Sequence, residues 1–423
     1  MLYQFYQWLQ QEGYRFPGIG LFQFITFRAM MAVLLSLVIT LIFGKQIINK
    51  LRSLQVGESV RELGLQGEEQ KKGTPTMGGF IILMGILIPT LLFANLEKIY
   101  IQLLLLSTIW LGLVGFVDDY LKLRAKRLAQ QKGIQFQKSN KDGLAGWFKV
   151  LGQVGLGIII SATLLFNEDV SVMREYKGDK KPTGASEIRY QGSVRYFVKA
   201  NEPVTTIPFV KEHEFNYTRL LPESMREYGW VVYMLVIIFI VTAVSNGANI
   251  TDGLDGLATG VSALIGGCLG LFAYASGNLV LADYLNIMYI PNLGEVSIFI
   301  AAMIGACIGF LWYNAYPAQV FMGDTGSLAL GGIIAALAII IRKELLIPFF
   351  CAVFLIENLS VMIQVGYFKY TRKKYGEGRR IFLMSPLHHH YQKKGFHESK
   401  IAVRFWIVTL LFVVFTIMSL KIR

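Results

Sequence analysis

The chain is poor in charged residues and in cysteine. Only 16% of its 423 residues are charged, whereas 54% are hydrophobic, a balance that is too apolar for an ordinary soluble protein. The three cysteines, Cys268, Cys307 and Cys351, lie in apolar runs, and their spacing fits neither a disulfide framework nor a metal site. No Walker A pattern for binding ATP phosphates is present either. These absences exclude disulfide-rich and simple soluble classes.

Long apolar runs are abundant instead, and many have the length of about 20 residues that crosses a bilayer as a helix. They predict an all-α polytopic membrane protein, formed as a single domain over residues 1–423. Because the number of spans is even, both ends of the chain are expected on the same side of the membrane. The ten predicted spans are 22–46, 78–96, 99–117, 148–166, 228–246, 257–276, 297–315, 326–342, 345–368 and 402–420.

Basic residues predict the orientation of the chain in the membrane. Loops after odd-numbered spans contain 23 Lys and Arg, and the short segments on the opposite side contain 6. Because basic loops stay in the cytoplasm, the first set is predicted to be cytoplasmic and both termini periplasmic. The net charge of +13 fits a lipid bilayer with anionic headgroups or anionic substrates. Nucleic acid is not expected as a partner, because the basic residues are divided among membrane loops.

One long segment, 167–227, falls on the predicted periplasmic side. Stretches such as 193–199 alternate between polar and apolar residues, which predicts short strands in a hairpin or small sheet. Because loops tolerate insertion, we interpret this segment as a small β-containing periplasmic insertion within the single domain.

Unusual polar clusters occur in five places, and all five fall on the predicted cytoplasmic side. Because hydropathy and basic residues set the topology, this agreement is an independent check. In NGANITDGLDG the polar positions recur every three residues, and such a group at the end of a span is costly unless it has a function. The clusters are 71–79, 118–122, 246–256, 314–327 and 385–390.

The residue types in these clusters suit phosphate chemistry. Carboxylate oxygens are ligands for Mg²⁺ or Mn²⁺, which bridge substrate phosphates, and lysines supply positive charge for a diphosphate. Histidines can donate to phosphate, bind metal or transfer protons. The carboxylates are Asp118, Asp119, Asp252, Asp255 and Asp324; the lysines are Lys71, Lys122, Lys141 and Lys149; the histidines are His388 to His390.

Each cluster taken alone also has a structural interpretation. Asp252, Asp255 and Asp324 can cap helices, the Asp118–Asp119 pair can be a solvated helix end, and glycine-rich stretches often form helix-packing surfaces in membranes. The occurrence of all the clusters on one side of one chain favours a shared site.

Five motifs extend this interpretation to a known family. In sequence and order they resemble the phospho-N-acetylmuramoyl-pentapeptide-transferases, and the resemblance covers nearly the whole chain apart from 167–227 and the long N-terminal stretch. The motifs are GTPTMGG at 73–79, GFVDDYLK at 115–122, NITDGLDGLA at 249–258, NAYPAQVFMGDTGSL at 314–328, and SPLHHHYQKKGFHE at 385–398 followed by VRFW at 403–406.

The resemblance implies a reaction in the bacterial cytoplasmic (inner) membrane, with the active site on the cytoplasmic side. Undecaprenyl phosphate would attack UDP-N-acetylmuramoyl-pentapeptide, release UMP and form lipid I, the first lipid-linked peptidoglycan precursor. The family resemblance also implies Mg²⁺ as cofactor and makes a homodimer plausible. Direct attack and an aspartyl-enzyme intermediate both stay open, with direct attack favoured because the lipid phosphate is already a nucleophile.

The resemblance also implies roles for individual residues. Asp324 resembles the Mg²⁺ ligand, Asp118 the base acting on the lipid phosphate, and Phe321 the ring that stacks on uracil. Asp119 is the neighbour of that base. The uridine pocket would include Asn249, Asp252, Gly253 and Leu254. The other active-site positions implied are Lys71, Thr76, Lys122, Lys141, Asn246, Asp255, Asn314, His388 and His389.

Two other functions compete with this interpretation. A sister enzyme would transfer an N-acetylhexosamine-1-phosphate from a UDP-sugar to a polyprenyl phosphate, and it would share the aspartates and the metal. An ion or phosphate transporter would also need intramembrane carboxylates, but the clusters lie at one face and no inverted repeat is evident. Within the fold, a broken or tilted span is expected near 345–368, with its apolar side chains lining a groove for the lipid tail.

Overall fold

The computed structural model describes residues 1–14, 17–54, 71, 73–131, 143–176, 186–190, 193–200, 202–208, 214–285 and 287–420. Within these residues nine helices are long and apolar enough to cross a membrane. They contain α2 (Ile25–Ser53), α4 (Ile99–Gln131), α5 (Gly146–Phe166), α6 (Gly229–Thr251), α7 (Leu257–Ser276), α9 (Val296–Asn314), α10 (Gly323–Ile340), α12 (Ala352–Tyr375) and α14 (Glu398–Ser419).

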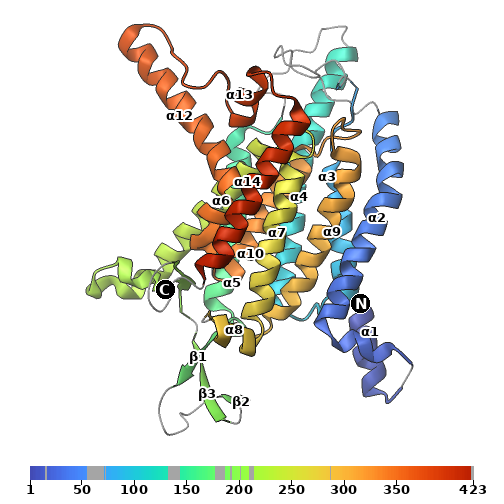
Figure 1. Ribbon diagram of the computed structural model, residues 1–423, viewed down its shortest axis with the longest axis vertical. Coiled ribbons are helices and arrows are strands. Elements are labelled where there is room, and N and C mark those ends of the chain that lie inside the picture. Colours follow the sequence, from blue (N-terminus) through green and yellow to red (C-terminus); the bar gives the residue numbers. More distant parts are fainter. Residues whose placement is uncertain are drawn as a thin grey trace.

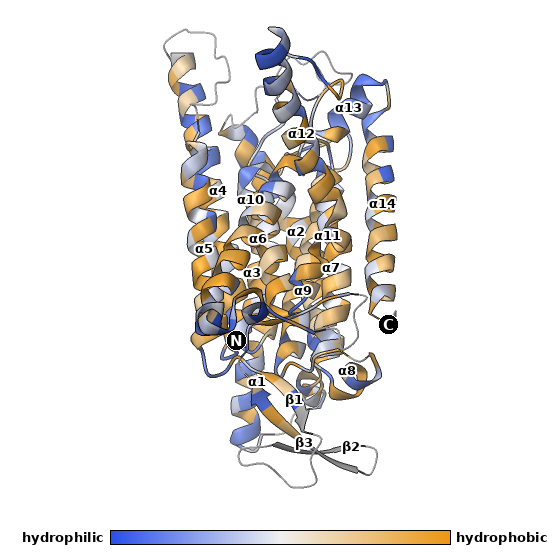
Figure 2. Cartoon of the chain, turned by 90° about the vertical axis from the view of Figure 1, so that its left-hand side faces the viewer, coloured by the Kyte–Doolittle hydropathy of each residue, from blue (hydrophilic) through white to orange (hydrophobic). Residues whose placement is uncertain are grey.

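A shorter apolar helix, α3 (Gly79–Phe93), has 15 residues and contains Pro89. With α3, the apolar helices of the described residues correspond to the ten predicted spans. The prediction of an all-α polytopic membrane protein is therefore confirmed. In Figure 2 the middle of the bundle is predominantly hydrophobic and its two ends are more hydrophilic, as a membrane-spanning bundle requires.

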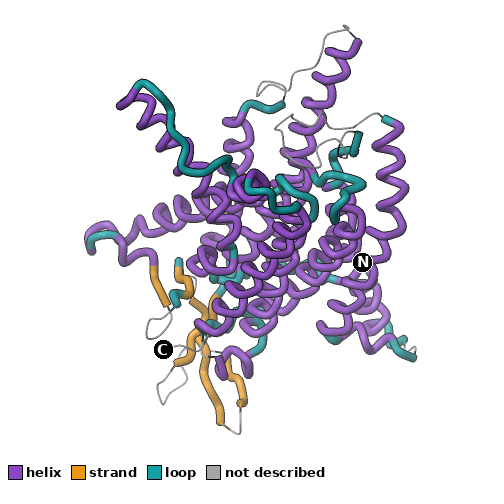
Figure 3. The backbone as a smooth tube through the Cα atoms, turned by 45° about the horizontal axis from the view of Figure 1, so that its top comes forward, coloured by secondary structure: helices purple, strands orange, loops and turns teal. Residues whose placement is uncertain are grey.

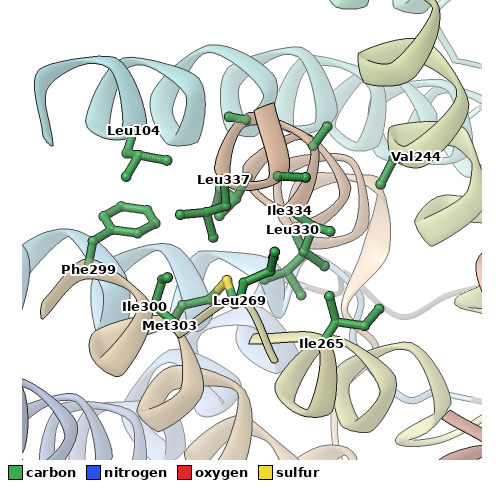
Figure 4. Packing of buried hydrophobic residues seen from close by; sticks show 14 of the residues in the cluster. Leu104, Val244, Ile265, Leu269, Phe299, Ile300, Met303, Leu330, Ile334 and Leu337 are labelled. Atoms are coloured by element: carbon green, nitrogen blue, oxygen red, sulfur yellow. The ribbon is translucent and has the colours of Figure 1, made fainter. Parts of the chain in front are cut away.

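Helix α10 lies at the centre of this bundle. All of its residues from Thr325 to Ile340 are buried, and it packs against α4 and α6. Its side chains Leu330, Ile334 and Leu337 meet those of α4, α7 and α9 in the core (Figure 4). The only carboxylate of the helix, Asp324, lies in its first turn, and the other residues of the helix are apolar or small. The helix therefore places this carboxylate at the end of the bundle.

The two ends of the bundle differ. At one end, here called the α13 end, α12 projects outward and α13 (Leu387–Lys393) lies nearby (Figures 1 and 3). At the other, here called the sheet end, lie the strands, α1 (Leu2–Gln11) and α8 (Leu279–Leu285). Helix α14 also finishes at the sheet end, so both ends of the described chain lie on the same side of the bundle.

The segment 167–227 forms strands, as predicted. Strands β1 (Val172–Tyr176), β3 (Ser193–Ala200) and β2 (Ser186–Tyr190) pair antiparallel in that order. A second sheet pairs β4 (Val204–Thr206) with β5 (Glu214–Asn216). The 3-10 turns η3 (Tyr217–Leu220) and η4 (Glu223–Tyr228) lead into α6.

A buried polar seam attaches β4 to the bundle. The amide of Thr206 donates to the carbonyl of Arg342 at 3.0 Å, and Lys343 Nζ donates to Thr206 Oγ1 at 2.6 Å. Tyr217 donates to Glu344 at 3.1 Å. This seam was not predicted, because its partners are far apart in the sequence.

The predicted break in the span near 345–368 is confirmed. The 3-10 turn η6 (Glu344–Leu346) and the short helix α11 (Ile347–Phe350) precede Cys351, where φ and ψ leave the helical region. Helix α12 then starts in a new direction and projects from the bundle (Figure 1), and its last turn is exposed and basic.

At the sheet end, helix α1 and the 3-10 turn η1 (Ile19–Gln23) precede α2. A buried ion pair between Arg28 of α2 and Glu295 holds this region, with an N···O distance of 2.6 Å. The 3-10 turn η5 (Leu293–Glu295) carries that glutamate into α9. The pair was not predicted from the sequence, since its members are 267 residues apart.

Candidate active site

Close helix contacts bring the site together at the α13 end. A Cβ atom at Gly115 of α4 would overlap the backbone carbonyl of Asp324, and one at Gly79 of α3 would overlap the backbone of Gly326. Glycine is therefore needed at both crossings, since it has no Cβ. Because Asp118 lies about one turn after Gly115, the crossing places it beside Asp324.

Three carboxylates form a compact cluster there. One oxygen of each of Asp118, Asp119 and Asp324 lies within 4.8 Å of the others. Asp118 and Asp119 are buried, at 0% and 3% exposure. Three carboxylates within this distance form a donor set of hard oxygens that can hold a divalent cation such as Mg²⁺. The sequence predicted Asp324 as a metal ligand, and the structure places two further carboxylates beside it.

Two lysines neutralise part of this negative charge. Lys122 Nζ lies 2.5 Å from Asp118 and 3.1 Å from Asp324. Lys149 Nζ of α5 lies 2.9 Å from Asp118 and also pairs with Asp324. The amide of Leu144 donates to Asp118 at 2.7 Å. The two ammonium groups therefore bridge the same pair of carboxylates.

Asp119 has different partners from its neighbour. It accepts hydrogen bonds from the amide and the hydroxyl of Thr325, at 2.9 Å and 2.7 Å, and from the amide of Asp324 at 3.2 Å. These donors belong to the first turn of α10, where backbone amides have no partner within the helix. Asp119 therefore fixes the start of α10, and with it the position of Asp324.

The polar face of α6 reaches this cluster through Asn249. Its amide donates to Asp324 Oδ1 at 3.0 Å and to Ser327 Oγ at 2.8 Å. Asn246, one turn earlier, donates instead to Gln153 of α5 at 3.0 Å. The predicted period of three thus places the two asparagines against different helices. Helix α6 ends at Thr251, before Asp252.

A second charged cluster lies around Lys71. Its ammonium group is 2.9 Å from Asp255 and 2.5 Å from Glu398. Burial lowers the pKa of Lys71, but these two carboxylates outweigh burial, so its pKa lies above the usual value. Lys71 is therefore a protonated link between two carboxylates, and its charge is already compensated by the protein.

Asp255 and Asn314 hold the loops around this second cluster. Asp255 Oδ2 accepts from the amide of Ala318 at 3.0 Å. Asn314 accepts from the amide of Gly256 at 3.1 Å and donates to the carbonyl of Val320 at 2.9 Å. Both side chains thereby join the 252–256 turn to the 315–322 loop.

The segment around Thr76 runs along the same loop. Phe321 donates its amide to the carbonyl of Pro75 at 2.8 Å, and its own carbonyl accepts from Gly78 at 2.8 Å. A Cβ at Gly323 would lie 3.0 Å from Thr76 Oγ1, so Thr76 stands beside the start of α10. The Phe321 ring is partly exposed and lies 5.9 Å from Lys71 Nζ, which leaves ring surface available for stacking.

The histidines enter the site through α13. Glu357 of α12 accepts from the amides of Leu387 and His388, at 2.8 Å and 3.2 Å, and its carboxylate is 3.2 Å from His388 Nδ1. A Cβ at Gly253 would overlap the buried His388 ring. His388 therefore packs directly on the 253–254 turn that includes Leu254.

His389 is the more accessible histidine of the pair. Its Nδ1 lies 2.7 Å from Gln392 Oε1. Burial, with the neighbouring His388, lowers the pKa of His389 to about 4, so the ring is neutral at pH 7. A neutral imidazole can accept a proton or a hydrogen bond, whereas an imidazolium cannot.

A pocket of about 560 Å³ opens beside α13, between α12 and the segment that precedes α13. Basic side chains contribute to its lining, and the pocket therefore favours an anionic ligand. They are Lys369, Arg380 and Lys393.

Most of the predicted residues thus form two linked groups at one end of the bundle, whereas Asn246 lies against Gln153 of α5, outside both groups. The first contains Asp118, Asp119, Asp324, Lys122, Asn249 and, beside it, Thr76. The second contains Lys71, Asp252, Gly253, Leu254, Asp255, Asn314, Phe321, His388 and His389. Lys141 lies outside the described residues.

Sequence reasoning missed Glu357 and Glu398, and it named Lys149 only as a nearby charge. An acidic residue within an otherwise apolar span is costly unless it is paired. That signal was available for Glu357, whereas Glu398 lies in the polar loop before the last predicted span.

Fold and site together define a multi-pass membrane protein with a carboxylate and lysine site at one end. Residues 189–342 match the model of glycosyl transferase family 4.

Curated relatives identify the family more closely. The chain is 54% identical over 426 residues to the phospho-N-acetylmuramoyl-pentapeptide-transferase of Flavobacterium psychrophilum, and 52% identical over 440 residues to that of Parabacteroides distasonis. It is 51% identical over 423 residues to the enzyme of the same name from Amoebophilus asiaticus. Each comparison covers 100% of both proteins. The chain belongs to the phospho-N-acetylmuramoyl-pentapeptide-transferase family.

Proposed function

We propose that this enzyme transfers phospho-N-acetylmuramoyl-pentapeptide from its UDP-linked donor to undecaprenyl phosphate, releasing UMP and forming lipid I. The full-length relatives support this reaction. The observation that carries it within the structure is the cluster of Asp118, Asp119 and Asp324, bridged by two lysines. Such a cluster suits a reaction between two anionic phosphates.

Mg²⁺ bound by the three carboxylates would neutralise phosphate charge and align the diphosphate. An oxygen of the lipid phosphate attacks the β-phosphorus of the donor, and the bond from that phosphorus to the oxygen retained by UMP breaks. One diphosphate linkage forms as another is lost, so no further co-reactant is needed. Lys122 and Lys149 lie where they can stabilise the charge of the transition state.

Asp118 is the residue of α4 that faces both lysines. Its resemblance to the base of the family suggests that it accepts a proton from the lipid phosphate. Where the lipid phosphate arrives already ionised, Asp118 instead keeps Lys122 and Lys149 in place. Direct attack by the lipid phosphate remains our preferred route.

The second group would hold the rest of the donor. Phe321 and the 252–254 turn would form the uridine pocket, with the ring of Phe321 stacking on uracil. The basic pocket beside α13 fits the carboxylates of the peptide. Lys369→Ala should then raise the KM for the peptide donor only. An unchanged KM for this donor would show that the pocket does not bind the peptide.

We place the α13 end in the bacterial cytoplasm and the sheet end, with both termini, in the periplasm. The excess of basic residues in the loops at the α13 end supports this orientation. The UDP-linked donor is a charged nucleotide that does not cross a bilayer unaided, so its site has to face the compartment that holds it.

The test compares two donors. Purified protein with undecaprenyl phosphate and Mg²⁺ is given UDP-N-acetylmuramoyl-pentapeptide or UDP-N-acetylglucosamine, and labelled lipid is measured. Turnover of the peptide donor alone is expected. Turnover of the simple sugar would assign the chain to the sister activity, and phosphate or ion flux into proteoliposomes without transfer would favour a transporter.

A further inference from the structure

Glu398, in the first turn of α14, is a buried carboxylate with no role in the reaction described above. It is 4% exposed. Its Oε1 accepts a hydrogen bond from Lys71 Nζ at 2.5 Å and another from the amide of Asp255 at 2.8 Å. Its Oε2 is buried and has no hydrogen-bond partner among the described residues. A buried carboxylate with one oxygen unpaired is costly, so the position needs a reason.

The contacts of Glu398 join three segments that are far apart in the sequence. Lys71 precedes α3, Asp255 belongs to the 252–256 turn, and Glu398 starts α14. The same turn carries Gly253, which packs on His388. Phe321 also lies close to Lys71, with its ring centre 5.9 Å from the ammonium group. Glu398 is thus the support behind both walls of the proposed uridine pocket.

The charges also assign a role to Lys71. One ammonium group faces Asp255 and Glu398, which lie outside the carboxylate cluster proposed to bind metal and phosphate. Lys122 and Lys149 face the carboxylate cluster instead. Lys71 and Glu398 therefore act on the shape of the pocket, while the other two lysines act on the phosphates.

We propose that Glu398 is a positioning residue for the nucleotide end of the donor, acting through Lys71 and the 252–256 turn. The proposal rests on the proposed function for the identity of that donor. Glu398 itself does not touch the reacting atoms. Loss of the carboxylate removes one of the two anionic partners of Lys71 and the acceptor of the Asp255 amide, so the contact that joins Lys71, the 252–256 turn and α14 is lost.

The test is UMP binding to the purified protein, measured by calorimetry, together with steady-state kinetics. Glu398→Gln keeps the size of the side chain and removes its charge. We expect the Kd for UMP and the KM for the donor to rise roughly tenfold, as for loss of a charge-assisted hydrogen bond. The kcat should stay within about threefold, and the KM for undecaprenyl phosphate should not change.

Glu344→Gln is the matched control. Glu344 is equally buried, at 2% exposure, and accepts a hydrogen bond from Tyr217, but it lies at the sheet end. The same substitution there should lower the melting temperature without changing the Kd for UMP. If the two variants weaken UMP binding equally, the effect is general destabilisation and the proposal is wrong.

Two more variants keep the test decisive. Glu398→Asp retains the charge on a shorter side chain and should raise the Kd for UMP less than Glu398→Gln does; if only this variant folds, an unchanged Kd overturns the proposal. Adding Lys71→Met to Glu398→Gln should add little further loss, because the two residues act as one unit. Absence of UMP binding by the unaltered protein would instead contradict the proposed function.

Discussion

At the residue scale, the adjacent aspartates of α4 show how neighbours in sequence divide their work. Asp118 faces the ammonium groups of Lys122 and Lys149, whereas Asp119 accepts its hydrogen bonds from the first turn of α10. The sequence predicted both as site residues, but only the family resemblance separated them, by implying that Asp118 is the base. Their roles follow from the crossing of α4 and α10, which hydropathy does not encode.

The anchoring role of Asp119 makes a prediction about Thr325. Thr325→Val keeps the shape of the side chain and removes the hydroxyl that donates to Asp119 at 2.7 Å. Loss of a hydrogen bond to a charged group costs about 1.5–3 kcal/mol, so the melting temperature should fall. Because Asp324 moves with the start of α10, kcat should fall roughly tenfold or more. An unchanged kcat, measured on folded protein, would contradict the anchoring role.

His389 makes a prediction about pH. The folded state holds its pKa at about 4, below the value near 6.5 of a free histidine. Between these values the unfolded chain binds a proton that the folded protein does not, so stability should fall as pH drops from 6.5 towards 4. His389→Gln should reduce this fall in melting temperature. If the melting temperatures of the two proteins fall equally as the pH drops from 6.5 towards 4, the assignment is contradicted.

At the element scale, the site depends on helices that approach closely at glycine. Hydropathy predicted the spans because the length of an apolar run is a local property. It could not predict the pairing of Lys71 with Glu398, which are 327 residues apart, or of Asn249 with Asp324. Such contacts depend on which helices pack against each other and on the position along their axes at which they cross. The predicted break in the span near 345–368 lies at Cys351, between α11 and α12.

Gly115 tests the importance of close approach. In Gly115→Ala the new Cβ would overlap the backbone of Asp324, so α4 has to move away from α10. Overpacking of this kind costs typically 1–3 kcal/mol, and the separation of Asp118 from Asp324 should reduce kcat at least tenfold.

The control is Gly267→Ala in α7. Gly267 is exposed, and a Cβ there would meet nothing within 4 Å. Both variants introduce the same methyl group into a membrane helix. Equal kcat and melting temperature for the two would show that the crossing of α4 and α10 tolerates the extra atom, contrary to this account.

At the scale of the whole molecule, the candidate active site and the extramembrane sheet lie at opposite ends of the helix bundle. The carboxylate and lysine cluster lies at the α13 end, while the strands and both ends of the described chain lie at the sheet end (Figure 1). The buried seam at Arg342–Glu344 fixes β4 to the bundle. The described strands of the insertion therefore lie at the opposite end of the bundle from the site.

The orientation of the molecule can be measured with single cysteines. The native cysteines are all buried, at 0–1% exposure, so they should react slowly. Gln11→Cys on α1 should be labelled in intact cells by a maleimide that cannot cross the membrane, and Lys374→Cys on α12 should react only after the cells are opened. The reverse pattern would place the site in the periplasm.

The most direct test of the central claim is the rate of UMP release by the purified protein with UDP-N-acetylmuramoyl-pentapeptide and undecaprenyl phosphate. We predict release that requires Mg²⁺, stops on chelation, and falls at least a hundredfold in Asp324→Asn, which removes the charge of one carboxylate of the cluster. Release that continues undiminished in Asp324→Asn or after chelation would contradict the assignment of the carboxylate cluster as the active site.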